Sequence, residues 1–470
     1  MPPLLADFIH AGACIPICEK FLTLPLLQKG AFIMLLDFKF SNYKSFYDET
    51  NFSMTPAPQQ TGLDYSILSE KIGAKKYRGL SSAVIYGPNA SGKTNLIGAM
   101  DTMRAIVLRG NIKNSNIVSS PNQAAFMLEL IPNCDAIDIP VSFSVCFLDQ
   151  GMVFNYSFSA IFGNFLEKDC KRWILRESLY INEKLVFERD NDGLKLDTPK
   201  VIKNYINPSF SKNISSSVEI ALDSLSADEL FLCNGFKSIF SKELVSTILD
   251  WFENKFIVIY RADSIQSMRK FANPADHTIY VEKTLTEVAK EFGITANALG
   301  YRADEDDVVL CSVFDDKKIA IPAEDFESYG TIRFINEFPL IIRALLQGAT
   351  LIMDEFDASI HPMALMSIIN IFHNDEININ HAQLIFNTHN PIFLDASLFR
   401  RDEIKFVERN KATNRSIHYA LSDFKTANGV RKGEDYMKNY FVSRYGAIEE
   451  VDFSSILKEI IHENEVKNNG

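Results

Sequence analysis

Gly87-Pro88-Asn89-Ala90-Ser91-Gly92-Lys93-Thr94 is the stretch that decides the fold of this chain. It matches the phosphate-loop pattern of two glycines with four residues between them, followed by lysine and a hydroxyl residue. An apolar run at 83–86 precedes it and a helix-forming run at 93–108 follows it, which is the required order of strand, loop and helix. Glycines let backbone N–H groups approach phosphates, the lysine reaches the β and γ oxygens, and the hydroxyl ligates Mg²⁺. The stretch therefore predicts a nucleotide site that includes Gly87, Asn89, Ser91, Gly92, Lys93 and Thr94.

A second half of the site lies downstream, at Ala349-Thr350-Leu351-Ile352-Met353-Asp354-Glu355. An apolar run of strand length that ends in two acids predicts a buried parallel strand with carboxylates at its tip. We expect Asp354 to hold Mg²⁺, directly or through water, and Glu355 to polarise the water that attacks the γ-phosphate. Such a run is common by itself, and it becomes specific when it follows a phosphate loop.

A Ser-x-Gly turn, Ser328-Tyr329-Gly330, opens an apolar helical run at 334–346 just before the acidic strand. A turn of this kind presents N–H groups and a hydroxyl to an anion, so Ser328 and Gly330 are candidate nucleotide contacts. The alternative is an ordinary helix cap with serine at its start.

A third apolar run, Gln383-Leu384-Ile385-Phe386-Asn387, predicts another strand, and Thr388-His389-Asn390-Pro391 forms its polar tip. His389 could contact the γ-phosphate or the attacking water, which makes it a candidate catalytic residue beside Lys93 and Glu355. A purely structural histidine is the alternative. Asp357 and His361-Pro362 follow the acidic pair, where a loop could reach a second subunit.

The order of phosphate loop, Ser-x-Gly turn, acidic strand and strand ending in histidine resembles the ABC-type ATPases. In detail it is similar to the stand-alone SMC-like and OLD-like branch, and to the bacterial AAA/ABC-like ATPases of abortive-infection, retron, Septu and PARIS-type antiphage systems. The resemblance covers the chain from about Met34 onward. It is carried by Gly-Pro-Asn-x-Ser-Gly-Lys-Thr at 87–94, Ser-Tyr-Gly-Thr at 328–331 with Arg333, Asp-Glu-Phe-Asp-x-x-x-His-Pro at 354–362, Thr-His-Asn-Pro at 388–391, and the stretches 38–46 and 430–446.

The resemblance implies an α/β P-loop NTPase of the ABC/SMC-head type, with a mixed sheet, an antiparallel β layer and a helical insertion. It implies two copies that sandwich two ATP molecules with Mg²⁺. In such a dimer Ser328 and Gly330 of one subunit face a group on the other, formed by Lys93, Thr94, Asp354, Glu355 and His389. The resemblance names no secure glutamine for the loop that senses Mg²⁺ in this fold, and Gln123 and Gln150 are the candidates.

Three functions are compatible with this resemblance. The first is an ATP-hydrolysing sensor or scaffold of a bacterial antiphage or toxin system, working as a homodimer or larger homo-oligomer with a separate effector, nuclease or toxin. The second is a DNA repair or recombination ATPase that grips duplex DNA. The third is the motor subunit of a transporter, for which the large insertion and the degenerate Ser-Tyr-Gly-Thr signature are unfavourable.

The character of the chain changes several times along its length. Alternating apolar residues at 141–147 and 153–161 predict a β-hairpin, and heptads that would indicate a long coiled-coil arm are absent. We predict five parts: an N-terminal extension at 1–33, with Met34 a possible native start; an ATPase lobe with the phosphate loop at 34–135; an antiparallel β layer at 136–198; a helical insertion at 199–307; and a second ATPase half with C-terminal cap at 308–470.

Charge and cysteine content narrow the class further. The formal net charge of −12 argues against binding of duplex DNA by the whole surface, although a local basic groove is compatible with it. The clusters Lys75-Lys76-Tyr77-Arg78 and Lys171-Arg172 fit solvated faces better than a nucleic-acid track. Seven scattered cysteines without a C-x-x-C pair indicate free thiols in a reducing cytoplasm, and the apolar runs are too short to predict a membrane span.

Overall fold

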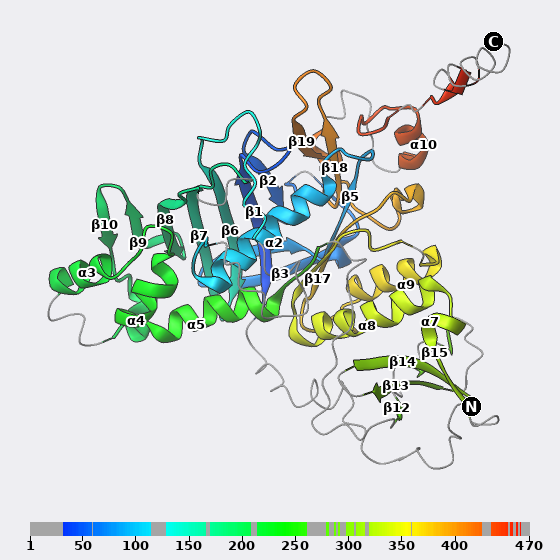
Figure 1. Ribbon diagram of the computed structural model, residues 1–470, viewed down its shortest axis with the longest axis horizontal. Helices are drawn as coiled ribbons and strands as arrows, with labels where there is room; N and C mark the ends of the chain where they lie inside the picture. Colours follow the sequence, from blue (N-terminus) through cyan, green and yellow to red (C-terminus); the bar gives the residue numbers. More distant parts are fainter. Residues whose placement is uncertain are drawn as a thin grey trace, which may run out of the picture.

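A computed structural model gives the fold of the chain (Figure 1). It describes residues 32–58, 60–113, 128–165, 170–207, 214–260, 279–281, 286–287, 290–291, 298–304, 307–314, 319–358, 360–424, 434–449, 452–454, 457–458 and 461. Most of the predicted N-terminal extension, at 1–31, lies outside the described residues, and the first described strand begins at Met34.

A seven-stranded antiparallel sheet forms one layer of the molecule. Its strand order is β10-β9-β8-β7-β6-β1-β2. The predicted hairpin is confirmed as β6 and β7, which turn at Gln150 and Gly151 with φ of 47° and 71°. Unlike the prediction for 136–198, the layer also includes two strands from ahead of the phosphate loop, because β1 pairs with β6. The strands are β1 (Met34–Ser41), β2 (Thr50–Ser53), β6 (Val141–Asp149), β7 (Met152–Ile161), β8 (Trp173–Ile181), β9 (Lys184–Asp190) and β10 (Gly193–Leu196).

A six-stranded sheet forms the central layer and carries the predicted motif strands. Its order is β11-β16-β17-β5-β18-β19, with every neighbouring pair parallel except β18 and β19. Every residue of β5, β16 and β17 is buried, as expected for parallel strands covered on both faces. The strands are β5 (Ser82–Tyr86), β11 (Phe256–Ile259), β16 (Thr350–Met353), β17 (Gln383–Asn387), β18 (Ile404–Arg409) and β19 (Ser416–Ala420).

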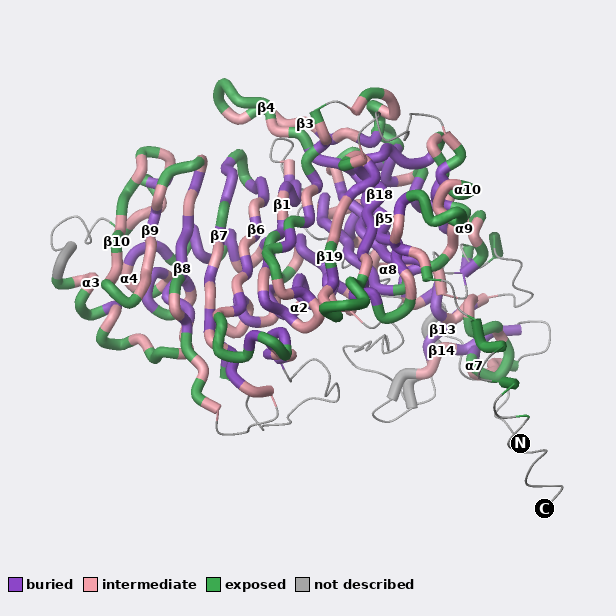
Figure 2. Tube along the Cα trace, turned by 90° about the horizontal axis from the view of Figure 1, so that it is seen from above, coloured by how far each residue is buried: buried purple, intermediate pink, exposed green. Residues whose placement is uncertain are grey.

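Helices cover the two faces of the central sheet. On one face α2 (Lys93–Arg109) shares a hydrophobic core with the antiparallel sheet, and Ile85, Ile352 and Ile385 join that core. On the other face α8 (Tyr329–Gln347) and α9 (Pro362–Phe372) pack over the alternate residues of the same strands. The buried residues accordingly run as continuous bands through both sheets (Figure 2). The predicted α/β fold with an antiparallel β layer is confirmed.

The stretch between 199 and 307 differs in part from the predicted helical insertion. The described elements are helical as far as Lys255, namely η4 (Lys200–Tyr205), α3 (Ile214–Asp223), η6 (Leu232–Phe236), α4 (Lys237–Ile239), α5 (Lys242–Asp250) and η7 (Trp251–Lys255). The next strand, β11, belongs to the central sheet because it pairs residue by residue with β16. A separate antiparallel sheet follows, made of β12 (Ile279–Val281), β13 (Ala298–Asp304), β14 (Asp307–Phe314) and β15 (Ile319–Pro322). The five-part division of the chain stays a prediction.

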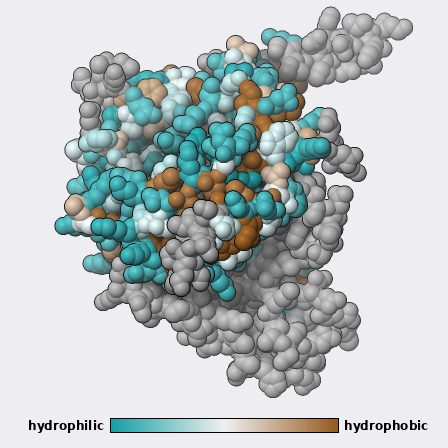
Figure 3. Space-filling model, turned by 90° about the vertical axis from the view of Figure 1, so that its left-hand side faces the viewer, coloured by the Kyte–Doolittle hydropathy of each residue, from teal (hydrophilic) through white to brown (hydrophobic). Residues whose placement is uncertain are grey.

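Smaller elements complete the described structure. Among them are η2 (Asp64–Ser66), the hairpin of β3 (Ile67–Ile72) and β4 (Lys75–Leu80), α7 (Ala323–Phe326), η9 (Pro391–Phe393), η10 (Leu421–Asp423) and α10 (Tyr436–Phe441). Seen from the left-hand side of Figure 1, the surface is mostly hydrophilic and a hydrophobic strip crosses it (Figure 3). In the part of the chain that is described, no helix combines the length and the apolar character needed to cross a bilayer.

The side chain of Gln383, the first residue of β17, joins the two large sheets. Its Oε1 accepts from Leu35 N at 2.6 Å and from Thr350 Oγ1 at 3.0 Å. Its Nε2 donates to Leu80 O at 2.8 Å and to Leu35 O at 3.2 Å. The amide is buried and all its hydrogen-bonding positions are used, so β1 and β4 are held against the amino end of the central sheet.

We predict that Gln383→Leu lowers the free energy of unfolding by ~2–4 kcal/mol, because it leaves buried backbone groups of Leu35 and Leu80 without partners. Gln347→Leu is the matched control, since Gln347 accepts one bond from Arg343 at the end of α8, and its effect should stay below ~1 kcal/mol. Denaturant unfolding followed by circular dichroism measures both. Equal effects of the two substitutions would contradict the role given to Gln383.

Candidate nucleotide site

The phosphate loop at 87–94 lies at the carboxyl end of β5 and leads directly into α2. Two of its positions require glycine. A Cβ on Gly87 would collide with the Val407 carbonyl oxygen of β18, and Gly92, at φ 113°, lies against the hydroxyls of Ser416 and Ser45. The loop is therefore packed against neighbouring chain segments rather than free in solvent, and its shape is fixed by contacts on both sides.

A small hydroxyl cluster supports the loop from β19 and from the segment after β1. Ser416 Oγ donates to Ser91 O and lies at hydrogen-bond distance, 2.8 Å, from Ser45 Oγ. Asn95, on the first turn of α2, donates its Nδ2 to the same Ser45 oxygen at 2.8 Å. Ser45, Asn95 and Ser416 were not predicted as site residues, because their partners are distant along the chain.

Lys93 lies inside the loop. Its side chain is buried, and Nζ donates to Gly87 O at 2.8 Å and to Pro88 O at 3.0 Å. Burial lowers the pKa of Lys93 to about 8, while the carboxylates of Asp354, Glu355 and Asp357 act in the opposite direction. The ammonium group is thus held at the loop by carbonyl dipoles and by nearby acids, where phosphate oxygens would be its natural partners.

The structure brings together the two predicted metal ligands. Asp354 is buried at the tip of β16, and its Oδ1 accepts from Thr94 Oγ1 at 3.2 Å. The same oxygen accepts from Asn387 Nδ2. A threonine hydroxyl and a carboxylate with an orienting amide are the oxygen ligands that Mg²⁺ takes beside nucleotide phosphates. Thr94 and Asp354 therefore fit a magnesium ion.

Glu355 lies next to this pair with an exposed side chain and a left-handed backbone, at φ 52°. Both backbone polar groups of Glu355 form hydrogen bonds. The N–H donates to Asn387 Oδ1, and the carbonyl oxygen accepts from Arg333 Nη2 at 2.6 Å. The carboxylate is left facing solvent, as a group that activates water requires.

Asn387, which the sequence analysis did not select, connects these residues. Its amide contacts the carboxylate of Asp354 and the backbone of Glu355, so it fixes one relative to the other. The available signal was a buried polar residue closing the apolar strand β17, directly before Thr388.

His389 lies at the same edge, immediately after β17, and is exposed. Partial burial and the charge of Lys93 lower the pKa of its imidazole, while Asp357 and Glu355 act in the opposite direction. The neighbouring Thr388 Oγ1 donates to Asp357 Oδ2 at 2.6 Å. His389 is thus close enough to the phosphate-loop lysine to feel its charge, and a neutral ring can accept a hydrogen bond.

Ser328 and Gly330 lie at the start of α8, where the ordinary cap geometry is present. Ser328 Oγ accepts from Thr331 N at 3.2 Å. Between the described residues, no hydrogen bond joins Ser328 or Gly330 to the phosphate loop of the same chain. The contact across a dimer that the resemblance implies for them stays a prediction.

The same helix reaches the site through Arg333, one turn further along. Arg333 is buried, and its Nε donates to Glu337 Oε1 at 2.8 Å while Nη2 holds the Glu355 carbonyl. Burial raises the pKa of Glu337 to about 7, and Arg333 opposes the shift. Glu337 Oε2 has no hydrogen-bond partner among the described residues.

The remaining candidates are placed as follows. Gln150 turns between β6 and β7, beside Asp149, which pairs with Lys255 at 2.9 Å just before β11. This is the amino end of the central sheet, whereas the phosphate loop lies at the carboxyl end, so Gln150 is excluded as the residue that senses Mg²⁺. Gln123 lies outside the described residues. His361 caps α9, its Nδ1 accepting from Met363 N at 3.2 Å.

Two comparisons with known proteins found a match. The profile of the family described as "AAA domain, putative AbiEii toxin, Type IV TA system" matches residues 82–395, which include both halves of the site. The chain belongs to this AAA-domain family. A solved SMC head domain from Thermotoga maritima is 12% identical to this AAA-domain protein, over 82% of this chain and 98% of that one, with a TM-score of 0.33. No curated protein matches the chain.

We predict that Asn387→Ala weakens the binding of Mg-ATP by ~10–100-fold, because the amide orients Asp354, the carboxylate expected to hold the metal. Binding of ATP in the presence of EDTA should change little. Titration with a fluorescent ATP analogue, with and without Mg²⁺, measures the difference. Asn390→Ala, which removes only the cap of η9, is the matched control. Equal weakening in both conditions would contradict the orienting role of Asn387.

The Glu337 carboxyl should make stability depend on pH. Its pKa is about 7 in the folded chain and 4.5 in an unfolded one, so between these values the folded state holds the extra proton. Stability contributed by this group therefore falls as pH rises through that window. Glu337→Gln removes the dependence, because glutamine is neutral at every pH. The melting temperatures of the two proteins should be similar at the lower end of the window and diverge towards its upper end, where the wild type becomes the less stable. Two parallel curves would show that Glu337 titrates normally.

Proposed function

We propose that this AAA-domain protein binds Mg-ATP at the phosphate loop and hydrolyses it. The single observation that carries the proposal is the contact between Thr94 and Asp354, 3.2 Å apart at the mouth of a loop that already holds Lys93. A magnesium ion bound there would neutralise charge on the β- and γ-phosphates. The loop N–H groups and Lys93 would hold the phosphates in place for attack.

Glu355 is the proposed general base. It follows the metal-binding carboxylate directly, its side chain is exposed, and its backbone is fixed by Asn387 and Arg333. A carboxylate held in this way can take the proton of a water that lies beyond the γ-phosphate. His389, which is exposed just after β17, would form a hydrogen bond with the γ-phosphate or with the attacking water.

We propose that two copies close around two ATP molecules, with Ser328 and Gly330 of each copy completing the site of the other. The start of α8 is suited to this because Ser328 is exposed and the helix end presents free N–H groups. Two large apolar side chains near the site are also exposed, Tyr329 to 60% and Met363 to 64%. Exposed apolar groups of this size support a surface that becomes covered.

We propose that the ATPase works in the cytoplasm as the sensor or scaffold of an antiphage or toxin system, with a separate effector. The family description, which names a putative toxin of a type IV toxin–antitoxin system, supports a role in such a system. ATP binding would favour the closed dimer and hydrolysis the open one, so the nucleotide state could hold or release the effector.

We predict that Glu355→Gln slows ATP turnover by at least ~100-fold while ATP remains bound, because the substitution removes the base and keeps the size and the backbone contacts. The variant should accumulate as a closed dimer with Mg-ATP, visible by size-exclusion chromatography with light scattering. Unchanged turnover would assign the base elsewhere, with His389 the next candidate.

Lys93→Ala is the companion variant, since it should lose nucleotide binding as well as turnover. If Lys93→Ala kept both ATP turnover and protection of cells against phage, the proposed mechanism would be wrong. Purification of the Glu355→Gln protein from its host with Mg-ATP separates the roles. A stoichiometric toxin or nuclease supports the defence role, and duplex DNA with DNA-stimulated turnover would support a repair ATPase instead.

A further inference from the structure

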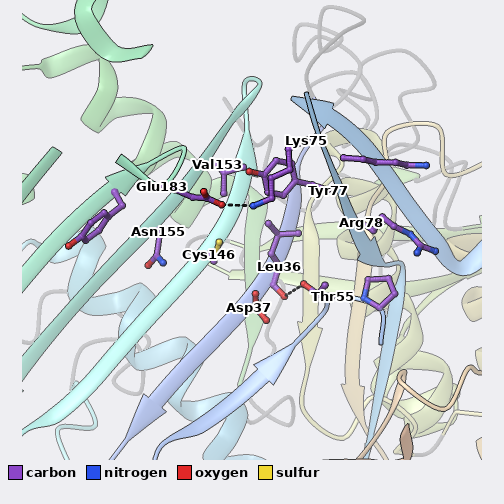
Figure 4. Close-up of a pocket in the computed structure, with 13 residues that line it drawn as sticks. Leu36, Asp37, Thr55, Lys75, Tyr77, Arg78, Cys146, Val153, Asn155 and Glu183 are labelled. Atoms are coloured by element: carbon purple, nitrogen blue, oxygen red, sulfur yellow. Dashed lines mark hydrogen bonds and ion pairs between the residues drawn. The ribbon is translucent and has the colours of Figure 1, made fainter. Parts of the chain in front are cut away.

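A groove of about 660 Å³ lies beside the β3–β4 hairpin (Figure 4). Its size is within the range of ~300–1,000 Å³ that is usual for ligand sites. One wall is β4, and the other comes from the face of the antiparallel sheet that points away from α2. The residues that line it include Leu36, Thr55, Lys76, Tyr77, Arg78 and Val153.

The groove runs along the edge of β4 and not under one of its faces. Four successive residues, Lys75 to Arg78, line it. Neighbouring side chains of a strand point to opposite faces, so a cavity that touches all four must follow the strand edge. In the described part of the chain β4 pairs with β3 alone, which leaves the backbone N–H and C=O groups of its other edge directed at the groove.

That edge is already used by an extended segment at its far end. Leu80 N donates to Met54 O at 2.7 Å, and Met54 N donates to Leu36 O at 2.8 Å. The segment after β2 thus fits between β4 and β1 at this point. It then leaves at Thr55 and Pro56, which line the groove, and the space beside Lys75 to Arg78 opens where it departs. A second extended segment could continue along the same edge.

The side chains around the groove favour an acidic occupant with apolar residues at alternate positions. Leu36 and Val153 form an apolar floor with Tyr77 beside them. Lys76 and Arg78 are exposed, and neither has a carboxylate within 4.0 Å among the described residues. Their charge is local, because the whole chain carries −12. An acidic partner would be repelled by most of the surface and attracted here.

We propose that this groove binds an extended acidic segment of a partner protein, which adds to the edge of β4 as a third strand. Main-chain hydrogen bonds to β4 would hold the segment, an apolar side chain would rest on Leu36 and Val153, and acids would face Lys76 and Arg78. A peptide fits better than a nucleic acid, because the groove combines a strand edge with an apolar floor at Leu36 and Val153, which a phosphate backbone would not use. Glu183 pairs with Lys75 across the opening (Figure 4).

The groove and the nucleotide site lie at opposite ends of the central sheet. Leu35 is next to the floor residue Leu36, and its N–H donates a hydrogen bond to Gln383 at the amino end of β17. Asn387, at the other end of β17, lies at the nucleotide site. The proposal therefore does not depend on ATP hydrolysis. Substitutions on the groove should leave basal ATP turnover unchanged, and this also reports that the variant is folded.

The test is selection of displayed random linear peptides on the full-length protein. Peptides of about twelve residues are long enough to run along β4 at ~3.3 Å per residue. We expect enrichment of sequences with alternating acidic and apolar residues. A fluorescent copy of the best peptide should bind at least ~10-fold more weakly to Lys76→Glu/Arg78→Glu. N-methylation of alternate peptide amides should abolish binding, because strand addition needs their N–H groups.

Lys71→Glu is the matched control, since Lys71 is exposed on β3, pairs with Lys76 in the hairpin and does not line the groove. Its peptide binding should equal that of the wild type. The proposal is overturned if no peptide is enriched, if N-methylation has no effect, or if Lys71→Glu weakens binding as much as the double reversal. Salt-sensitive binding of labelled oligothymidylate that the double reversal abolishes would assign the groove to nucleic acid and also overturn it.

Discussion

The buried amide of Gln383 is the junction on which the arrangement of the molecule depends. It binds the backbone of β1 and of β4 and a side chain of β16, so three segments from distant parts of the chain meet at one residue. An apolar side chain of the same size would fill the space but satisfy none of these groups. Because β17 begins at Gln383 and ends at Asn387, the same short strand joins the sheets at one end and orders the nucleotide site at the other.

In the nucleotide site, one lysine is surrounded by groups of opposite charge. Lys93 lies among loop carbonyls with three carboxylates close enough to raise its pKa against the effect of burial. Asp354 is buried and already carries two donors, whereas Glu355 faces solvent. Two neighbouring acids on one strand end thus have different surroundings, which suits one for a cation and the other for a proton.

The sequence was most informative for motifs whose residues lie close together along the chain. The phosphate loop, the acidic strand and the helix after Ser328 are each encoded by residues within one turn or strand, and the structure has all three where they were predicted. Asn387 and Ser416 were missed, and Arg333 was named without a role, because each acts on a partner brought near only by folding. Gln150 was a poor candidate for the same reason: its distance from the loop is set by sheet topology, which no local pattern contains.

The strand β11 shows a related limit. Phe256 to Ile259 follow a helical stretch and are themselves a short apolar run, which periodicity cannot assign to one unit or another. Their place in the central sheet follows from pairing with β16, nearly a hundred residues later. The antiparallel sheet of β12 to β15 similarly depends on strand pairing, which no local pattern of residues contains.

The hydrogen bond from Arg333 to position 355 ends on a carbonyl oxygen, and every amino acid carries one. Whatever side chain occupies that position, the link between α8 and the loop after β16 can survive. The carboxylate and the backbone link to α8 therefore belong to one residue without constraining each other. A related sequence could therefore replace the carboxylate at this position and still keep α8 joined to the loop after β16.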